Sequence, residues 1–272
     1  MADAAKWILD ALASCDPIEK AQKARALYAG FCDGSFDVVS QQIVPDRPGR
    51  PEAPALMAPK DVPKRRITKA ASGRIALLHA IAHIELNAID LALDMAIRYQ
   101  HHHLPLDFTK EWLSVADDEA RHFTLLHNRL HELDSFYGAM PAHDGLWQAA
   151  YSTRDDLLGR LAIAPLVLEA RGLDVTPHLL AKFHEVEDPQ SAAILEIIMH
   201  DEVGHVGIGK KWFDYQCGML RLDPISTWQG LVKRYFHGQL KPPFNISARN
   251  AARFSAAFYK PLADNSRSIS LG

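Results

Sequence analysis

The stretch Asp-Glu-Ala-Arg-His at residues 118–122 decides the fold, because its pattern returns as Asp-Glu-Val-Gly-His at residues 201–205. Each copy contains a Glu-x-x-His motif. Residues three apart on an α-helix lie on one face about one turn apart, so the carboxylate and the imidazole can bind the same metal ion. The two copies therefore predict two helices that each supply a glutamate and a histidine to a metal site.

Each motif is preceded by a glutamate in an apolar helical stretch. Glu85 lies 34 residues before Glu119, and Glu169 lies 33 residues before Glu202. A carboxylate that is buried without a partner is costly, so each of these glutamates needs a cation or becomes protonated. An interval of this size fits one long helix, a turn and the return to the same depth along an antiparallel neighbour. The chain is predicted to form two such helical hairpins.

This constellation resembles the ferritin-like di-iron carboxylate proteins, in which four bundle helices supply such a ligand set. The resemblance covers residues 73–216 and implies an all-α fold, a ferritin-like antiparallel four-helix bundle. Within that group, the chain resembles an uncharacterised bacterial family of ferritin-like domain proteins. The features that carry this resemblance are the extended arm, the sequence Asp-Glu-Ala-Arg-His and the run Leu-Glu-Ala-Arg-Gly-Leu-Asp at 168–174. Carried over by position, the implied metal ligands are Glu85, Glu119, His122, Glu169, Glu202 and His205.

Four domains or segments are expected along the chain. They are an N-terminal helical hairpin over 1–44, a Pro-rich extended arm over 45–72, the bundle over 73–216 and a C-terminal helical extension over 217–272. The hairpin contains helices at 3–14 and 17–31, the second capped by Asp16 and Pro17. The arm is predicted to wrap on the bundle rather than to act as a mobile linker, with Leu56, Met57 and Val62 as anchors.

The bundle helices are expected over 73–101, 107–136, 146–171 and 190–216, with a short helix near 176–187 and two further pieces at 225–237 and 247–259. Asp107 and Thr109 are candidate caps of the second bundle helix. The third is expected to stop at Gly172. Pro165 removes a backbone hydrogen bond four residues before Glu169 and is expected to kink that helix. The kink is either tolerated or opens the bundle for a substrate.

Composition narrows the class of protein. The 272 residues have a formal net charge of −3, with 48% hydrophobic and 23% charged residues, as in an ordinary soluble protein. No global basic excess favours generic nucleic-acid binding. No apolar run reaches membrane-spanning length, and the N-terminus lacks a signal-peptide pattern. The three cysteines are an odd, widely spaced set, so no disulfide framework is expected and a cytoplasmic setting is predicted.

A local basic cluster follows the arm. It is either a solvated approach to the first bundle helix or an anion site for a phosphate-bearing substrate or RNA. On that helix, His83 lies roughly opposite Glu85 and is not expected to face the same metal. His79 is either a residue that supports a metal ligand or, as we favour, an interfacial histidine. The cluster comprises Lys60, Lys64, Arg65, Arg66, Lys69 and Arg74.

The resemblance implies two metal ions, each with one histidine, one terminal carboxylate and shares of two bridging carboxylates. Such oxygen-rich sites suit Fe(II) or Mn(II), with zinc as an alternative in vitro. Metal-bound histidine usually donates its other ring hydrogen to a carboxylate. By similarity, Asp118 would orient His205 and Asp201 would orient His122, while Arg121 would neutralise one of these aspartates.

A di-iron centre of this kind implies reaction with O₂, with three outcomes. Tyrosyl-radical generation is disfavoured because Leu126 occupies the position where ribonucleotide reductase small subunits usually place the tyrosine. Iron storage by a ferroxidase is disfavoured by about 70 residues before the bundle and 55 after it. Oxidation or hydroxylation of an unidentified organic substrate, small molecule or RNA, with an unknown electron donor, is the leading hypothesis. A non-catalytic metal-binding helical protein is the alternative from another class, and a homodimer is expected.

Overall fold

A computed structural model describes residues 2–62 and 70–268, with side chains up to residue 263. The structure is 70% helix, and the residues that it describes contain no strand. The prediction of an all-α fold is confirmed, whereas the four-helix bundle and the division into four segments stay predictions. The chain forms two compact units, Met1–Gln148 with Lys182–Ile194 (unit 1) and Ala149–Ala181 with Leu195–Gly272 (unit 2).

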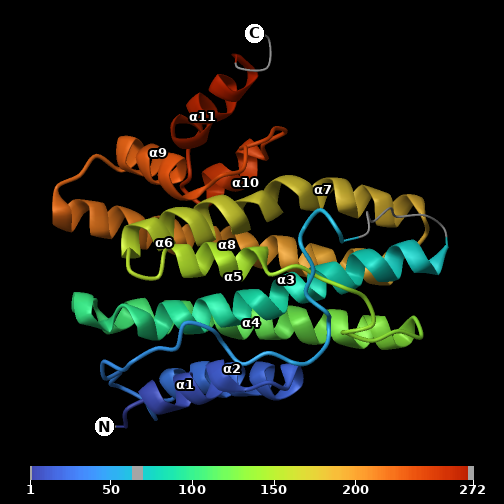
Figure 1. Cartoon of the computed structure of the whole chain (residues 1–272), viewed down its shortest axis with the longest axis horizontal. Helices are drawn as coiled ribbons and strands as arrows, with labels where there is room; N and C mark the ends of the chain where they lie inside the picture. The colour runs from blue at the N-terminus through green and yellow to red at the C-terminus, as the bar shows by residue number, and fades with distance from the viewer. Residues whose placement is uncertain (1, 63–69, 269–272) are drawn as a thin grey trace. The chain divides into compact units, whose positions relative to one another are not determined.

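Unit 1 begins with the short helices α1 (Ala5–Ala13) and α2 (Pro17–Cys32) (Figure 1). The Asp16 carboxylate accepts a hydrogen bond from the Glu19 amide at 2.8 Å, and Pro17 opens the helix. The predicted cap is therefore present, and it fixes where α2 starts.

The two long helices of unit 1 are α3 (Ala71–Arg98) and α4 (Leu106–Glu132), which pack along each other (Figure 1). A short 3-10 helix, η1 (Gln100–His102), separates them. The predicted caps of α4 are wrong: Pro105 precedes the helix, and the Thr109 hydroxyl donates to the Ala96 carbonyl at 3.1 Å. The helix ends at Glu132, earlier than predicted, and Asp134 has a left-handed φ of 55°.

Helix α3 is long and apolar enough to cross a membrane by length and composition, which corrects the expectation that no stretch reaches this length. However, 72% of its most apolar window is buried inside the structure. Burial of this extent is what the core helix of a soluble protein shows, because the protein itself covers the apolar surface.

The described part of the arm lies on unit 1. Lys20 donates to the Gly49 carbonyl at 2.8 Å, and Arg98 donates to the Pro45 carbonyl at 2.7 Å. A Cβ atom at Gly49 would lie only 2.0 Å from the Ala13 carbonyl oxygen, so only glycine fits this approach to the end of α1. Of the predicted anchors, Leu56 and Met57 remain 46% and 43% exposed and Val62 is half-buried, while the Met57 amide donates to the Ala142 carbonyl at 2.8 Å.

The predicted third bundle helix is broken. Helix α5 (Gly145–Ser152) stops, and α6 (Leu157–Ile163) starts anew where the Asp156 carboxylate accepts from the Gly159 amide at 2.8 Å. The chain then continues helically through Gly172 to the end of α7 (Ala170–Glu185), which absorbs the separate helix expected near 176–187. The Asp156 cap marks the start of α6, a helix boundary that the spacing of apolar residues in the sequence does not indicate.

Residues Ala164–Glu169 form a π-helix, η2, between α6 and α7. Pro165 lies at its start and cannot donate the usual backbone hydrogen bond, so the predicted distortion is present as a wider turn. On α8 (Pro189–Leu220), a Cβ atom at Gly209 would lie 2.3 Å from the Pro165 Cβ. Gly209 therefore lets α8 approach the π-helix closely.

Unit 2 continues with α9 (Pro224–Tyr235), α10 (Ile246–Ala251) and α11 (Ala256–Ser268). The single helix expected at 247–259 is two helices, because Arg253 has a left-handed φ of 59° between them. The aromatic residues of this region pack within unit 2: the buried Trp228 donates from its ring nitrogen to the Ala162 carbonyl at 3.2 Å and contacts Phe254 edge-on.

Candidate metal centre

Glu85, Glu119 and His122 form a buried cluster inside unit 1. Glu85 comes from α3, and the other two come from successive turns of α4. The His122 Nδ1 atom lies 3.1 Å from the Glu85 Oε2 atom and 3.4 Å from the Glu119 Oε2 atom. Each residue offers a ligand atom within 4.8 Å of the others, so the cluster could hold a metal ion.

Burial sets the electrostatics of this cluster. Glu119 and His122 are 0% exposed and Glu85 is 3% exposed. Burial, together with repulsion from Glu119, raises the pKa of Glu85 to about 8. Burial alone would lower the pKa of His122, but hydrogen bonds and attraction from Glu119 and Glu85 outweigh it and raise that pKa to about 11. Without a metal ion, the cluster therefore holds protons at neutral pH.

The donor spacing fits a metal ion. Ligands bound at about 2.1 Å and at right angles around an octahedral ion lie about 3.0 Å apart, and a tetrahedral ion separates them slightly more. The observed separations of 3.1 and 3.4 Å fall in this range. Within the described residues, no lysine or arginine forms an ion pair with Glu85. A divalent cation bound here would displace the protons of the cluster and balance the charge of the two carboxylates.

The other three predicted ligands lie in unit 2. Glu169 is the last residue of the π-helix, and Glu202 and His205 lie on α8, 9% and 2% exposed. A Cβ atom at Gly172 would lie 4.0 Å from the Glu202 carboxyl carbon, so this carboxyl group faces α7 one turn beyond Glu169. Each half of the ligand set thus occupies buried or half-buried helical positions within its own unit; that the six residues form one centre stays a prediction.

The residues predicted to support the histidines are less buried. Arg121 pairs with Asp118 at 2.9 Å, as expected for an arginine that neutralises one of the aspartates. Their side chains are 37% and 33% exposed. Asp201 is paired with His200 at 3.1 Å, and its side chain is 16% exposed. The orienting roles of Asp118 and Asp201 toward His205 and His122 stay predictions.

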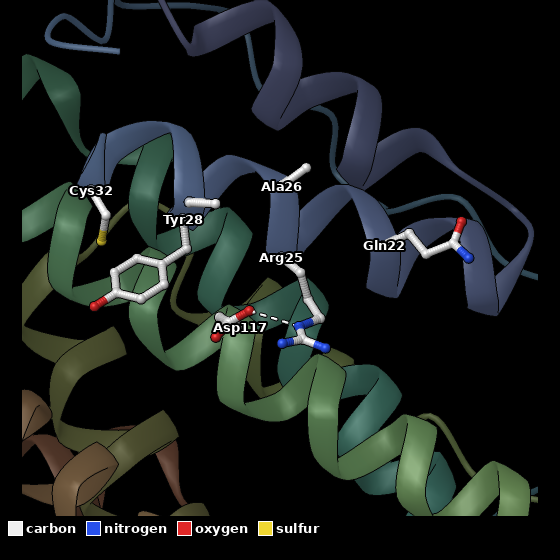
Figure 2. A pocket seen from close by; sticks show the side chains of 7 residues that line it. Gln22, Arg25, Ala26, Tyr28, Cys32 and Asp117 are labelled. Carbon is white, nitrogen blue, oxygen red and sulfur yellow. Dashed lines mark hydrogen bonds and ion pairs between the residues drawn. The ribbon is translucent and has the colours of Figure 1, made fainter. Parts of the chain in front are cut away.

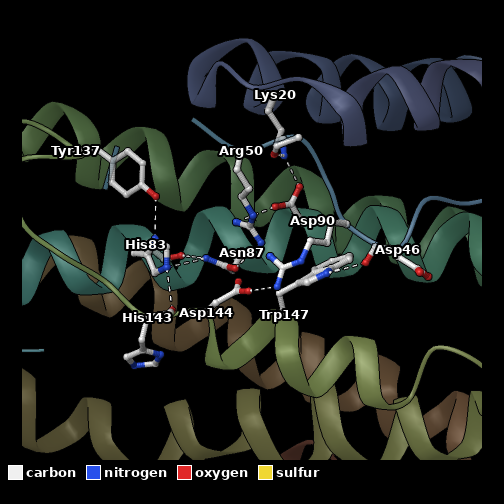
Figure 3. A network of polar contacts seen from close by, with 12 residues as sticks. Lys20, Asp46, Arg50, His83, Asn87, Asp90, Tyr137, His143, Asp144 and Trp147 are labelled. Atoms are coloured by element: carbon white, nitrogen blue, oxygen red, sulfur yellow. Dashed lines mark hydrogen bonds and ion pairs between the residues drawn. The ribbon is translucent and has the colours of Figure 1, made fainter. Parts of the chain in front are cut away.

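His79 and His83 serve the packing of unit 1. The His83 Nδ1 atom lies 2.8 Å from the Tyr137 hydroxyl, and its Nε2 atom lies 3.2 Å from the His143 carbonyl (Figure 3). Burial lowers the pKa of His83 to about 4, so the ring is neutral. His79 accepts a hydrogen bond from the Gly138 amide at 2.9 Å. Both histidines hold the segment after α4, so His79 is interfacial as the sequence predicted, and His83 contacts Tyr137, Asn87 and the His143 carbonyl.

A buried charged network on the same helix was missed by the sequence reasoning. The side chain of Asp90, which is 0% exposed, pairs with Lys20 from α2 and, at 3.1 Å, with Arg50 from the arm (Figure 3). Arg50 also donates to the Asn87 amide oxygen at 2.7 Å. Asp90 and Asp94 share the sequence feature that singled out Glu85, because each is an acidic residue in an apolar helix. That feature predicts a buried carboxylate that needs a positively charged partner at all three positions.

A shallow hollow of about 490 Å³ lies between α2 and α4. Figure 2 shows its exposed ion pair, in which the Arg25 Nε atom lies 3.0 Å from Asp117, with Tyr28 and Cys32 beside it. Asp117 precedes Glu119 by two residues, which places it on roughly the opposite side of α4. The hollow therefore lies roughly on the side of α4 opposite to Glu119.

The predicted basic cluster is only partly described. Lys64, Arg65, Arg66 and Lys69 lie outside the described residues, as does the arm proline Pro63. Lys60 is exposed, whereas Arg74 pairs with the buried Asp188 at 2.8 Å. Arg74 thus has a structural role in unit 1. Among the described members of the basic cluster, Lys60 is the one that remains available to bind an anion.

Comparison with known proteins gives a family but no activity. The chain matches the family described as "Protein of unknown function (DUF455)" over residues 13–260. An "Uncharacterized protein" of Haemophilus influenzae (strain ATCC 51907 / DSM 11121 / KW20 / Rd) is 43% identical over 210 residues, which are 75% of this chain and 73% of the relative. No solved structure matches the chain. The family match spans both Glu-x-x-His motifs and both preceding glutamates, and the chain belongs to the DUF455 family.

Proposed function

We propose that this protein is an O₂-dependent oxidoreductase that holds two iron ions, or iron and manganese, in a carboxylate-rich centre and oxidises or hydroxylates an organic substrate. The observation that carries the proposal is the buried cluster of Glu85, Glu119 and His122, with donor atoms 3.1 and 3.4 Å apart. Two carboxylates and one imidazole form the oxygen-rich donor set that suits Fe(II) or Mn(II).

Glu169, Glu202 and His205 complete the centre in this proposal. They repeat the residue types and the chain order of the first cluster, and Glu202 and His205 are buried on α8. Four carboxylates offset the charge of two divalent ions when both histidines are neutral. The π-helix that ends at Glu169 supports the assignment, since π-bulges occur frequently at functional sites.

The bound ions would supply the electrons and the Lewis acidity for reduction of O₂. The chain's own residues would bind the ions, fix their separation and exclude bulk water, since Glu119 and His122 are 0% exposed. Asp201 and Asp118 would accept the second ring hydrogen of His122 and His205, which fixes the orientation of each imidazole. The wider backbone turn at Pro165 would allow a substrate to reach Glu169.

The proposal also covers the cellular compartment, the electron donor, the oligomeric state and the possible RNA substrate. Cys15, Cys32 and Cys217 are free thiols, which fits a reducing cytoplasm. A separate protein would supply electrons, and two copies of the chain would pair through aromatic surface. If RNA is the substrate, the basic residues near 60–74 would bind it. The affinity of the protein for RNA should then fall steeply as salt concentration rises.

Anaerobic loading with Fe(II), followed by metal analysis and an oxygen-electrode measurement, tests the proposal. Wild-type protein should retain two irons per chain and consume O₂. Glu119→Gln should lose both properties because its carboxylate belongs to the buried cluster. Glu132→Gln, on the same helix but with its side chain 58% exposed, is the matched control and should behave as wild type.

The outcomes separate the alternatives. Two tightly bound irons without O₂ consumption would overturn the oxidoreductase and leave a metal-binding helical protein. O₂ consumption that deposits ferric iron without a substrate would favour a ferroxidase. Loss of only one ion in Glu202→Gln, with unchanged affinity for the other, would show that the two clusters are separate sites. Absence of stoichiometric metal would refute the ligand assignment.

A further inference from the structure

His127 and His131 form a pair of imidazoles at the end of α4, outside the buried cluster. They are four residues apart, so they occupy one face of the helix in successive turns. Their Nε2 atoms lie 3.2 Å apart, and the rings meet edge-on with centroids 4.6 Å apart. We propose that this pair is a second, surface metal site that chelates a late transition ion such as Zn²⁺, Ni²⁺ or Cu²⁺.

The separation of the two nitrogen atoms is what a chelated ion requires. Imidazole nitrogens bound to zinc at about 2.05 Å and at the tetrahedral angle are about 3.3 Å apart. Right-angled ligands around Ni²⁺ or Cu²⁺ are closer by a few tenths of an ångström. The observed 3.2 Å lies between these values. In metal-free protein, the same approach is a hydrogen bond in which one neutral ring donates its N–H to the other.

The surroundings of His127 favour the metal-binding form of its ring. Burial and the neighbouring His131 lower the pKa of His127, with the Asp16 carboxylate opposing this shift. A neutral imidazole is the form that binds metal ions. Asp16 also places a negative charge near the pair, which attracts a cation. His131 is exposed, so an ion can reach the pair from solvent.

The site is distinct from the buried cluster in both position and chemistry. His127 follows His122 by five residues, which turns it about 140° around the helix and about 7.5 Å along it. The buried cluster offers two carboxylates and one imidazole, whereas the surface pair offers nitrogen alone. Oxygen-rich sites favour iron or manganese, and imidazole suits zinc, nickel and copper. The chain thus presents two donor sets of different metal preference.

Titration of the full chain with Ni²⁺ and with Cu²⁺ tests this site. Wild type should bind one ion more than the proposed carboxylate-rich centre holds. The copper form should show nitrogen splitting from two imidazoles in its electron paramagnetic resonance spectrum. His131→Ala should weaken this ion about tenfold or more, because a single imidazole cannot chelate. The measurement is repeated in Glu119→Gln, where the surface ion should remain.

Two controls make the test specific. The double variant His131→Ala/Asn128→His keeps the number of histidines but places them next to each other in the sequence, where they cannot share an ion, and should also lose the site. His178→Ala removes an exposed histidine elsewhere and should bind as wild type. Unchanged nickel and copper binding in His127→Ala and His131→Ala would overturn the proposal, and so would a copper spectrum with one nitrogen. Neither result would bear on the buried cluster.

Discussion

The Nδ1 atom of His122 lies 3.1 Å from the Oε2 atom of Glu85, although 37 residues separate them in the chain. The contact joins α3 to α4 in the buried interior of unit 1 and brings together a carboxyl group and an imidazole that both hold a proton more tightly than usual. Burial and the neighbouring Glu119 raise the pKa of Glu85 to about 8, and the two carboxylates raise the pKa of His122 to about 11. Metal binding, proton release and stability are therefore linked at this contact.

Metal binding should release protons from this cluster. At pH 7 the metal-free Glu85 and His122 are both largely protonated, so an ion bound there should displace about two protons. Calorimetric titration in buffers of different ionisation enthalpy measures this number. Glu85→Gln should bind the ion more weakly, and the binding that remains should release about one proton fewer per chain. A binding enthalpy that does not depend on the buffer would contradict the protonated state of the cluster.

Metal-free protein should lose stability as pH rises through neutrality. The pKa of folded Glu85, about 8, lies above its ordinary value of 4.5, so protonation favours the folded state. This contribution is fully present below pH 4.5 and is lost as pH rises through 8; His122 acts in the same direction at higher pH.

Between pH 5 and 8, wild type should lose of the order of 3 kcal/mol more unfolding free energy than Glu85→Gln, which has no charge to gain. Urea unfolding in the presence of a chelator measures the difference. Glu52→Gln, at an exposed position of the arm, is the control and should follow wild type. Parallel pH profiles for wild type and Glu85→Gln would be inconsistent with a raised pKa at Glu85.

The buried pair of Lys20 and Asp90 should be costly to break and cheaper to remove as a whole. Asp90→Ala leaves the Lys20 ammonium, 2% exposed, without its carboxylate and should cost about 3–5 kcal/mol. The double variant Lys20→Met/Asp90→Leu removes both charges of the pair and should recover part of that loss, since Arg50, with its side chain 18% exposed, still loses its contact with Asp90. A double-mutant cycle by urea unfolding gives the coupling; additive effects would mean that the pair is not coupled.

Two glycines of α8 should respond oppositely to the same substitution. Gly209→Ala places a Cβ atom 2.3 Å from the Pro165 Cβ, and the resulting overpacking should cost about 1–3 kcal/mol. Gly204→Ala has no neighbour within 4 Å and should stabilise the helix by up to about 1 kcal/mol, since alanine has the higher helix propensity. Thermal and urea unfolding of both variants provide the comparison. Equal effects would argue against the close approach of α8 to the π-helix.

The sequence by itself determined the all-α fold, the start of α2 at Pro17, the distortion at Pro165 and the positions of Glu119 and His122 on one helical face. These features follow from local rules. Helix periodicity, the cap at Asp16 and the missing amide hydrogen of proline act over a few residues, so they can be predicted without knowledge of the packing.

Only the tertiary structure decided which charges meet. Glu85, Asp90 and Asp94 carry the same sequence signal, an acidic residue in an apolar helix. Asp94 pairs with Arg98 one turn further along the same helix, whereas Asp90 meets Lys20 and Arg50, and Glu85 meets Glu119 and His122, from other segments. The partners of Glu85 and Asp90 depend on which distant segment packs against that face of the helix, and the periodicity of a single helix does not contain this information; the pair of Asp94 and Arg98 follows from helical spacing alone.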